Sequence, residues 1–305
     1  MELVSVVIGT YNGATYISEQ LESILHQTYT PLEIIVVDDA SSDATLDILN
    51  TYSEKHSNIT VHPFDTNVGY IKNFERGIAL AKGNYIALSD QDDWWMPTKI
   101  EKLMSHMHHY DLVYCDSIFV DENLNELGSS FSETKNLISI NTPINLLIDN
   151  CVSGHASLFK KSLYDKAIPF PDFIPHDWWL AYVASTENNV YYLDEPLVKY
   201  RHHQNNIIAS SKKDKKTKKN KRSKRLKRIE KRKRITSFYD KCPDSLEEEK
   251  KIILSLKTSY NSFSLVNNFR RVRLFYVNRK EMLKTIKKTA PDKIIYIVTM
   301  FFRIK

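Results

Sequence analysis

Short apolar runs that do not alternate with polar residues limit the fold of this chain more than any other feature. Such runs occupy residues 3–8, 33–37 and 85–88, and segments with helical spacing of apolar residues separate them. A strand that is apolar on both faces must be covered on both faces, which is typical of a mostly parallel sheet flanked by helices. The sequence therefore predicts an α/β fold.

The expected elements follow from these runs and from the turn and capping residues between them. In the first part of the chain we expect strands at 3–8, 33–37, 59–62 and 85–88, and helices at 17–26, 41–55 and 71–81. Beyond residue 111 the pattern is more mixed, with strands expected at 112–120, 156–160, 190–193 and 196–200, and helices at 143–149, 176–185 and within 246–284.

Charge is distributed unevenly along the 305 residues. The segment Lys212–Arg234 contains 16 Lys and Arg against two acidic residues, a local charge of +14, whereas the rest of the chain sums to −8. This change in composition predicts an α/β domain at 1–208, a polybasic linker or helix at 209–235, and a helical C-terminal region with an apolar tail at 236–305.

The cysteines and the chain start bear on the compartment. The three cysteines are widely spaced and form no CxxC pair, which disfavours a zinc site or a disulfide framework. The first residues already read as a strand, and no apolar run approaches the ~18–20 residues needed to span a bilayer. We therefore expect the protein to lie on the cytoplasmic side of the cell membrane.

Polar residues follow three of the predicted strands. The first strand ends in Thr10, Tyr11 and Asn12, the second in Asp39, and the fourth runs into Asp90. Ligands of open α/β sheets bind at the carboxyl ends of the strands. We expect these loops to converge on one binding site.

An acidic cluster, Asp90-Gln91-Asp92-Asp93, follows the fourth strand. Asp90 and Asp92 are two residues apart, so they point to the same side and can bind Mg²⁺ or Mn²⁺, which prefer oxygen ligands. The role of Asp93 stays open. The alternative is an acidic surface turn that caps the helix beginning near Pro97.

Longer stretches of sequence resemble a known family. The segments VSVVIGTYNGATYISEQLESILHQTYTPLEIIVVDDASSD, NVGYIKNFERGIALAKGNYIALSDQDDWWMPTKIE, HDWWLAYVAS and YLDEPLVKYRHHQNN are similar to family 2 inverting glycosyltransferases of the GT-A fold, over residues 2–206. The form SDQDDxW resembles bacterial enzymes of lipopolysaccharide and capsule assembly, including rhamnosyltransferase-like members. The resemblance implies a nucleoside-diphosphate sugar donor, a divalent cation (Mg²⁺ or Mn²⁺), and a glycan or lipid-linked acceptor.

The resemblance also implies roles near the donor. Thr10, Tyr11 and Asn12 would lie beside the nucleotide, and Asp39 would recognise the base, although Asp39 also suits a helix N-cap. Asp90 would approach the ribose and the metal, and Asp92 would bind the metal.

On the acceptor side, the resemblance makes Asp177 the base that deprotonates the acceptor hydroxyl. An acidic residue in the first turn of a helix is the structural alternative. Trp178, Trp179 and His155 are candidates for the acceptor side, and packing roles are the alternative for each.

The segment Tyr200–Asn206 resembles a YRQHxxN element of the family. His203 is the implied third metal ligand or diphosphate contact, but His202 stands where Gln is common, so the choice between the two histidines stays open. Arg201 is a candidate phosphate contact. A plain polar loop is the alternative.

The basic segment suggests a partner of its own. No aromatic residue interrupts it, which disfavours nucleic acid as that partner. The basic segment, together with the apolar tail Ile294–Phe302, predicts binding to an anionic membrane surface. The tail would lie in the interface, and the protein would be peripheral on the inner face of the cell membrane. A solvated linker and a buried C-terminal helix are the alternatives.

Two other functions compete with glycosyl transfer. A sugar-nucleotide nucleotidyltransferase would show a basic glycine-rich loop after the first strand, but the loop GTYNGATY has no basic residue. A non-catalytic polybasic membrane- or nucleic-acid-binding protein would not need Asp39, Asp90, Asp92 and Asp177 together. A dehydrogenase is disfavoured because no GxGxxG follows the first strand.

Overall fold

The computed structural model describes residues 1–203, 221–262 and 264–302. Residues 212–220 of the predicted basic segment therefore lie outside the described residues. One sheet of nine strands runs through the larger part of the molecule, in the order β3-β2-β1-β4-β8-β6-β9-β5, with β7 paired to β6. The strands are β1 (Val4–Thr10), β2 (Leu32–Asp38), β3 (Ile59–Pro63), β4 (Tyr85–Ser89), β5 (Trp94–Trp95), β6 (Leu112–Val120), β7 (Glu126–Ser130), β8 (Ser157–Lys160) and β9 (Val190–Arg201).

Helices cover both faces of this sheet. They are α1 (Ile17–Leu25), α2 (Thr45–Lys55), α3 (Tyr70–Leu80), α4 (Lys99–Met104), α5 (Phe131–Thr134), α6 (Lys161–Ala167) and α7 (His176–Ser185), with the 3₁₀ turns η1 (Pro143–Leu146) and η2 (Gly154–Ala156). In β1, Val7 packs in a core with α3 and α7, whereas Val6 and Ile8 pack in a second core with α1 and α4. Two covered faces explain why the strands are apolar without alternation.

The parallel part of the sheet agrees with the prediction. Strands β3, β2, β1 and β4 are mutually parallel, so their carboxyl ends lie at one edge. The later strands make the sheet mixed, because β8 is antiparallel to both β4 and β6. The two segments expected at 190–193 and 196–200 form one strand, β9, which passes Pro196 through register shifts against β6. The α/β fold class is confirmed.

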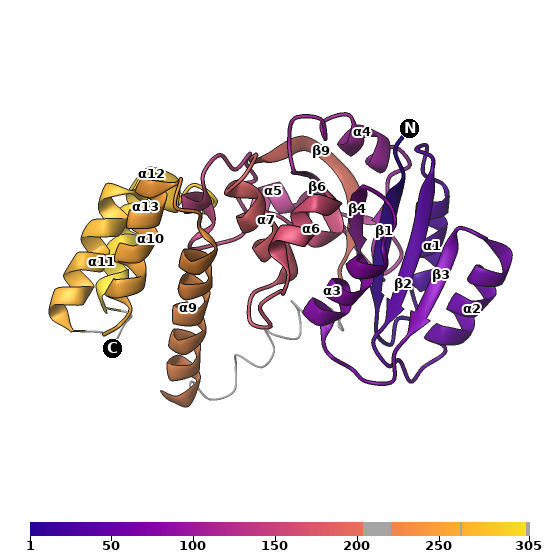
Figure 1. Cartoon of the computed structure of the whole chain (residues 1–305), viewed down its shortest axis with the longest axis horizontal. Coiled ribbons are helices and arrows are strands. Elements are labelled where there is room, and N and C mark those ends of the chain that lie inside the picture. Colours follow the sequence, from indigo (N-terminus) through magenta and orange to yellow (C-terminus); the bar gives the residue numbers. More distant parts are fainter. Residues whose placement is uncertain (204–220, 263, 303–305) are drawn as a thin grey trace.

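The C-terminal part is helical, as predicted, and lies at the opposite end of the molecule from β3 and α2 (Figure 1). It consists of α9 (Lys221–Lys241), α10 (Glu247–Ser259), α11 (Leu265–Val277), α12 (Arg279–Met282) and α13 (Ala290–Phe302). Its buried residues Ile235, Phe238 and Met282 belong to the same core as Trp178 and Tyr182 of α7. The extension is therefore packed onto the sheet domain, and the boundary expected near residue 208 stays a prediction.

The apolar tail forms the last helix, α13. Over the described residues, no helix combines the length and the hydrophobicity that crossing a membrane requires.

Candidate functional site

The loops after β1 and β2 interlock at the carboxyl edge of the sheet. Thr10 Oγ1 donates a hydrogen bond to Asp38 Oδ1 at 2.7 Å, and Asn12 Oδ1 accepts one from the Ser42 N–H at 2.8 Å. Asn12 has φ 50°, a left-handed conformation that asparagine tolerates better than most residues. The side chain of Tyr11 between them is exposed. This is where the sequence predicts the nucleotide.

The acidic loop after β4 is fastened to the first loop through Gln91. The Tyr11 N–H donates to Gln91 Oε1 at 2.9 Å, and Gln91 Nε2 donates to the Tyr11 carbonyl at 3.1 Å. A Cβ at Gly13 would lie 2.2 Å from Gln91 Oε1, so any other residue at this position would displace the Gln91 amide from these hydrogen bonds. The loop after β1 and the acidic loop after β4 are therefore held together by hydrogen bonds.

Asp39 is buried beside these loops. Its carboxylate accepts hydrogen bonds from the Val68 and Gly69 N–H groups, each at 2.9 Å, and from the Arg76 guanidinium at 2.8 Å. Asp39 thus holds the loop that leads into α3. It is not a side-chain cap of α2, whose N-cap residue is Ala44. Recognition of a base by Asp39 stays a prediction.

The acidic cluster concentrates negative charge where β4 ends. Desolvation by the surrounding protein, followed by the charges of Asp92 and Asp177, raises the pKa of Asp90 to about 7. Burial, followed by repulsion from Asp92 and Asp90, raises the pKa of Asp93 well above its usual range. A divalent cation would relieve this repulsion.

Asp92 and His203 are brought together from distant segments. His203 Nε2 lies 2.8 Å from Asp92 Oδ2, and the ring of Tyr16 lies beside the imidazole with centroids 4.9 Å apart. His202 instead directs its ring edge-on to Phe119, with centroids 4.7 Å apart. Of the two histidines, the geometry favours His203 as the metal ligand.

Asp177 lies in the first turn of α7, and its charge acts on Asp90. Burial raises the pKa of Asp177 to about 6, although hydrogen bonds from the Trp178 and Gly154 backbone lower it in part. The nearby Tyr70 hydroxyl has its pKa raised to about 12, first by burial and then by the charges of Asp177 and Asp90. Asp177 is therefore near enough to Asp90 for their charges to interact, and its role as the base stays a prediction.

Comparison with known proteins fits this geometry. The model of the glycosyl transferase family 2 matches residues 5–167, more than half of the chain. The chain belongs to glycosyltransferase family 2.

Curated relatives and a solved structure are similar to this chain. An uncharacterized glycosyltransferase of Rickettsia typhi is 33% identical over 212 residues, which span 66% of this chain and 64% of that protein. One of Haemophilus influenzae is 30% identical over 219 residues, spanning 67% of this chain and 66% of that protein. The crystal structure of Staphylococcus aureus TarS 1–349 with UDP-GlcNAc is 20% identical, covers 99% of this chain and 82% of its own, and has a TM-score of 0.63. At this identity the likeness shows the GT-A fold alone.

Arg201 occupies a different place from the phosphate contact that the sequence suggested. Its side chain is fully buried, and Nη2 donates to Glu19 Oε2 at 2.6 Å. Nε donates to the Asp92 carbonyl at 2.9 Å, while the Arg201 N–H donates to Asp93 Oδ1 at 3.2 Å. In this family 2 chain the geometry thus favours a role for Arg201 in holding the acidic loop rather than in touching the donor.

His155 also differs from its expected acceptor-side position. Its Nδ1 lies 3.7 Å from Asp90 Oδ2 and 3.9 Å from Asp93 Oδ2, beneath the acidic loop. Its Nε2 shares a hydrogen bond of 3.0 Å with Ser117 Oγ. Burial, followed by the charge of Lys99, lowers the pKa of His155 to about 3, so the ring is neutral.

Lys99 is a site residue that the sequence analysis missed. It is fully buried, its Nζ donates to the His155 carbonyl at 2.6 Å, and it lies 3.1 Å from the centroid of the Trp95 ring. Burial lowers its pKa to about 7, while Asp93 and Asp90 favour its charged form. A lysine two residues after Pro97 gives no signal of burial in the sequence.

Trp178 and Trp179 have the packing roles that were the alternative to the acceptor side. Both are buried, and their indole N–H groups donate to the carbonyls of Leu146 and Ala167 at 2.7 Å. Both rings pack on Phe238 of α9. They join α7 to the C-terminal extension.

The residues of the site fit a divalent cation. Asp92 and His203 offer a carboxylate oxygen and an imidazole nitrogen that lie 2.8 Å apart. Asp90, Asp93 and His155 offer further ligand atoms within 4.8 Å of one another. Asp93 Oδ2 is buried and has no hydrogen-bond partner among the described residues. This donor set suits Mg²⁺ or Mn²⁺.

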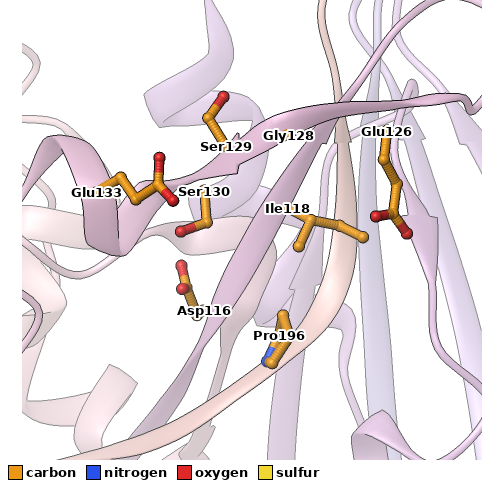
Figure 2. A pocket seen from close by; sticks show the side chains of 8 residues that line it. All are labelled: Asp116, Ile118, Glu126, Gly128, Ser129, Ser130, Glu133 and Pro196. Atoms are coloured by element: carbon orange, nitrogen blue, oxygen red, sulfur yellow. The ribbon is translucent and has the colours of Figure 1, made fainter.

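A separate pocket of about 270 Å³ is lined by residues of β6 and β7, with Glu133 of α5 and Pro196 of β9 (Figure 2). Asp116, Glu126 and Glu133 line it, together with Pro196 of β9. Asp116 is adjacent to Ser117, the hydrogen-bond partner of His155. None of the acidic-loop residues lines this pocket.

Proposed function

We propose that this chain is an inverting glycosyltransferase that takes its sugar from a nucleoside-diphosphate sugar in the presence of Mg²⁺ or Mn²⁺. The observation that carries the proposal is the placement of Asp177 on α7 facing the acidic loop, so close that its charge raises the pKa of Asp90. One carboxylate stands on the acceptor side, and the others stand on the donor side.

Asp177 is the base in this reaction. Its pKa of about 6 leaves it ionised at neutral pH and able to accept a proton from an acceptor hydroxyl. The acceptor oxygen forms a bond to the anomeric carbon as the bond to the diphosphate breaks, and the diphosphate leaves with that electron pair. The proton ends on the Asp177 carboxylate.

On the donor side, Asp92 and His203 would hold the cation, and Asp90 would contact both the cation and the ribose. The bound cation would neutralise charge on the departing diphosphate. Arg201 is a positioning residue, because its guanidinium donates to the Asp92 carbonyl and its backbone N–H donates to the Asp93 carboxylate. Thr10, Tyr11, Asn12 and Asp39 are assigned to the nucleotide.

The finer assignments are part of the same proposal. The acceptor is a glycan, lipid-linked, in the synthesis of a cell-surface polysaccharide such as lipopolysaccharide or capsule, with transfer of a hexosyl or deoxyhexosyl group such as rhamnose. The protein acts as a peripheral protein on the cytoplasmic face of the membrane. Support comes from the sequence form SDQDDxW and from the basic C-terminal part.

A thermal-shift screen of UDP-, dTDP- and GDP-sugars with and without Mn²⁺ tests the proposal. One nucleotide class should raise the melting temperature only when the cation is present, because cation and diphosphate bind together. If no nucleotide stabilises the protein in a cation-dependent way, the proposed function is refuted.

A further inference from the structure

The two parts of the chain carry opposite charge. Residues 1–203 contain 12 Lys and Arg against 28 Asp and Glu, a formal charge of −16, so the remaining residues carry +22. An anionic surface therefore repels the sheet domain and attracts the C-terminal part. Such a surface would orient the whole molecule.

The C-terminal part also exposes an apolar face. Helices α11 and α13 pack together, with the rings of Phe269 and Phe301 in contact at a centroid distance of 5.0 Å. Large apolar side chains of both helices are exposed: Leu265, Val266, Phe269, Tyr276 and Val277 in α11, and Ile294, Ile295 and Val298 in α13. Phe269 is 65% exposed and Ile295 is 60% exposed, which is unusual for side chains of this size.

This apolar face is not an unfilled part of the core. The opposite side of α11 is already packed, since Phe275 and Arg271 are fully buried and Arg271 Nε donates to Ser259 Oγ of α10 at 3.3 Å. In α13, Ile297 turns inward and is also buried. Each helix therefore has one buried side and one exposed apolar side.

Cations border the apolar face. Arg270 and Arg273 are exposed on α11 beside Phe269, and residues 264–302 carry nine Lys and Arg against two acidic residues. A second copy of this chain would bring one such cationic face against another, which is unfavourable. An anionic lipid surface complements both the apolar side chains and the surrounding cations.

We propose that the exposed face of α11 and α13 binds an anionic membrane surface and lies in its interface. The 13 residues of α13 span only about 20 Å, short of the ~30 Å hydrocarbon core, so the helix lies along the surface. The inference extends the proposed function, because a lipid-linked acceptor would be met at this surface. It does not depend on the donor site.

The test must use the full chain. Removing the extension would uncover Trp178 and Tyr182, which pack on Phe238, so a truncated protein would not report on membrane binding alone. Exposed side chains are the suitable targets. Val266→Ser with Ile295→Ser removes apolar surface from both helices, and Leu127→Ser, at an equally exposed leucine of β7, is the matched control.

Flotation with vesicles of neutral phosphatidylcholine, with and without 30% phosphatidylglycerol, gives the readout. We expect the wild type and Leu127→Ser to float only with the anionic vesicles, and the double variant to lose binding at least tenfold. Undiminished flotation of the double variant would assign binding to the basic segment and overturn the proposal. A wild-type protein that does not float with anionic vesicles would also overturn the proposal. Dimers of the wild type that the double variant abolishes would overturn it as well, because they would assign the apolar face to a second copy of the chain. Unchanged donor-dependent thermal shifts in the double variant would separate this outcome from failure of the proposed function.

Discussion

His203 Nε2 lies 2.8 Å from Asp92 Oδ2, although the two residues are 111 positions apart in the sequence. The end of β9 delivers the imidazole to the acidic loop that follows β4. This contact joins the two parts of the predicted metal site.

His203→Ala should weaken cation binding. Loss of the imidazole removes the nitrogen ligand next to Asp92, and we expect the Mn²⁺ concentration for half-maximal thermal shift to rise about 10-fold or more. His202→Ala is the matched control, because its ring packs on Phe119. An equal loss in both variants would argue against His203 as the ligand.

Asp177→Asn should stop transfer while leaving the donor bound. The amide cannot accept the acceptor proton, so turnover should fall about 10²- to 10⁴-fold, with the donor-dependent thermal shift retained. Asp172→Asn, at an exposed aspartate just before α7, should behave as the wild type. Turnover that survives in Asp177→Asn would exclude Asp177 as the base.

The pH dependence of transfer should show an acidic limb near pH 6. Asp177 is the base only when ionised, and burial raises its pKa to about 6, so kcat/KM should fall about tenfold per pH unit below that value. The limb is measured at saturating cation. If the residual activity of Asp177→Asn kept the same limb, the titrating group would be another residue.

Cation affinity should weaken as the pH falls below 7. The pKa of Asp90 is raised to about 7, so a proton occupies this carboxylate at lower pH and the cation must displace it. Calorimetric titration with Mn²⁺ at pH 6 and pH 8 should show tighter binding and less proton release at pH 8. Affinity that does not change with pH would contradict a role for Asp90 in holding the cation.

Trp178→Ala should destabilise the protein rather than affect the acceptor. The indole is buried, donates to the Leu146 carbonyl and lies under the Arg234 guanidinium at 4.1 Å. We expect the free energy of unfolding to fall by about 3–5 kcal/mol, measured by chemical denaturation. Trp94→Ala, at a partly exposed tryptophan, should cost less. A KM effect on the acceptor without loss of stability would reverse the packing assignment.

The sequence alone determined the parallel part of the sheet and the edge that carries the site. Apolar runs such as residues 33–37 must be covered on both faces, and this requirement is local to each strand. Once β1, β2 and β4 are parallel, Asn12, Asp39 and Asp90 necessarily follow their carboxyl ends. Strand geometry therefore located the acidic loop without any knowledge of distant contacts.

Only the tertiary structure decided what each side chain touches. Arg201 is buried under Asp92, His155 lies beneath Asp90, and Trp178 packs on the extension, because each contact joins segments that are far apart in the sequence. The helical pattern of the C-terminal part likewise could not show which side of α11 packs on α10. Burial of Lys99 and exposure of Phe269 reverse what their residue types suggest, since neighbours in space, and not the residue type, determine burial.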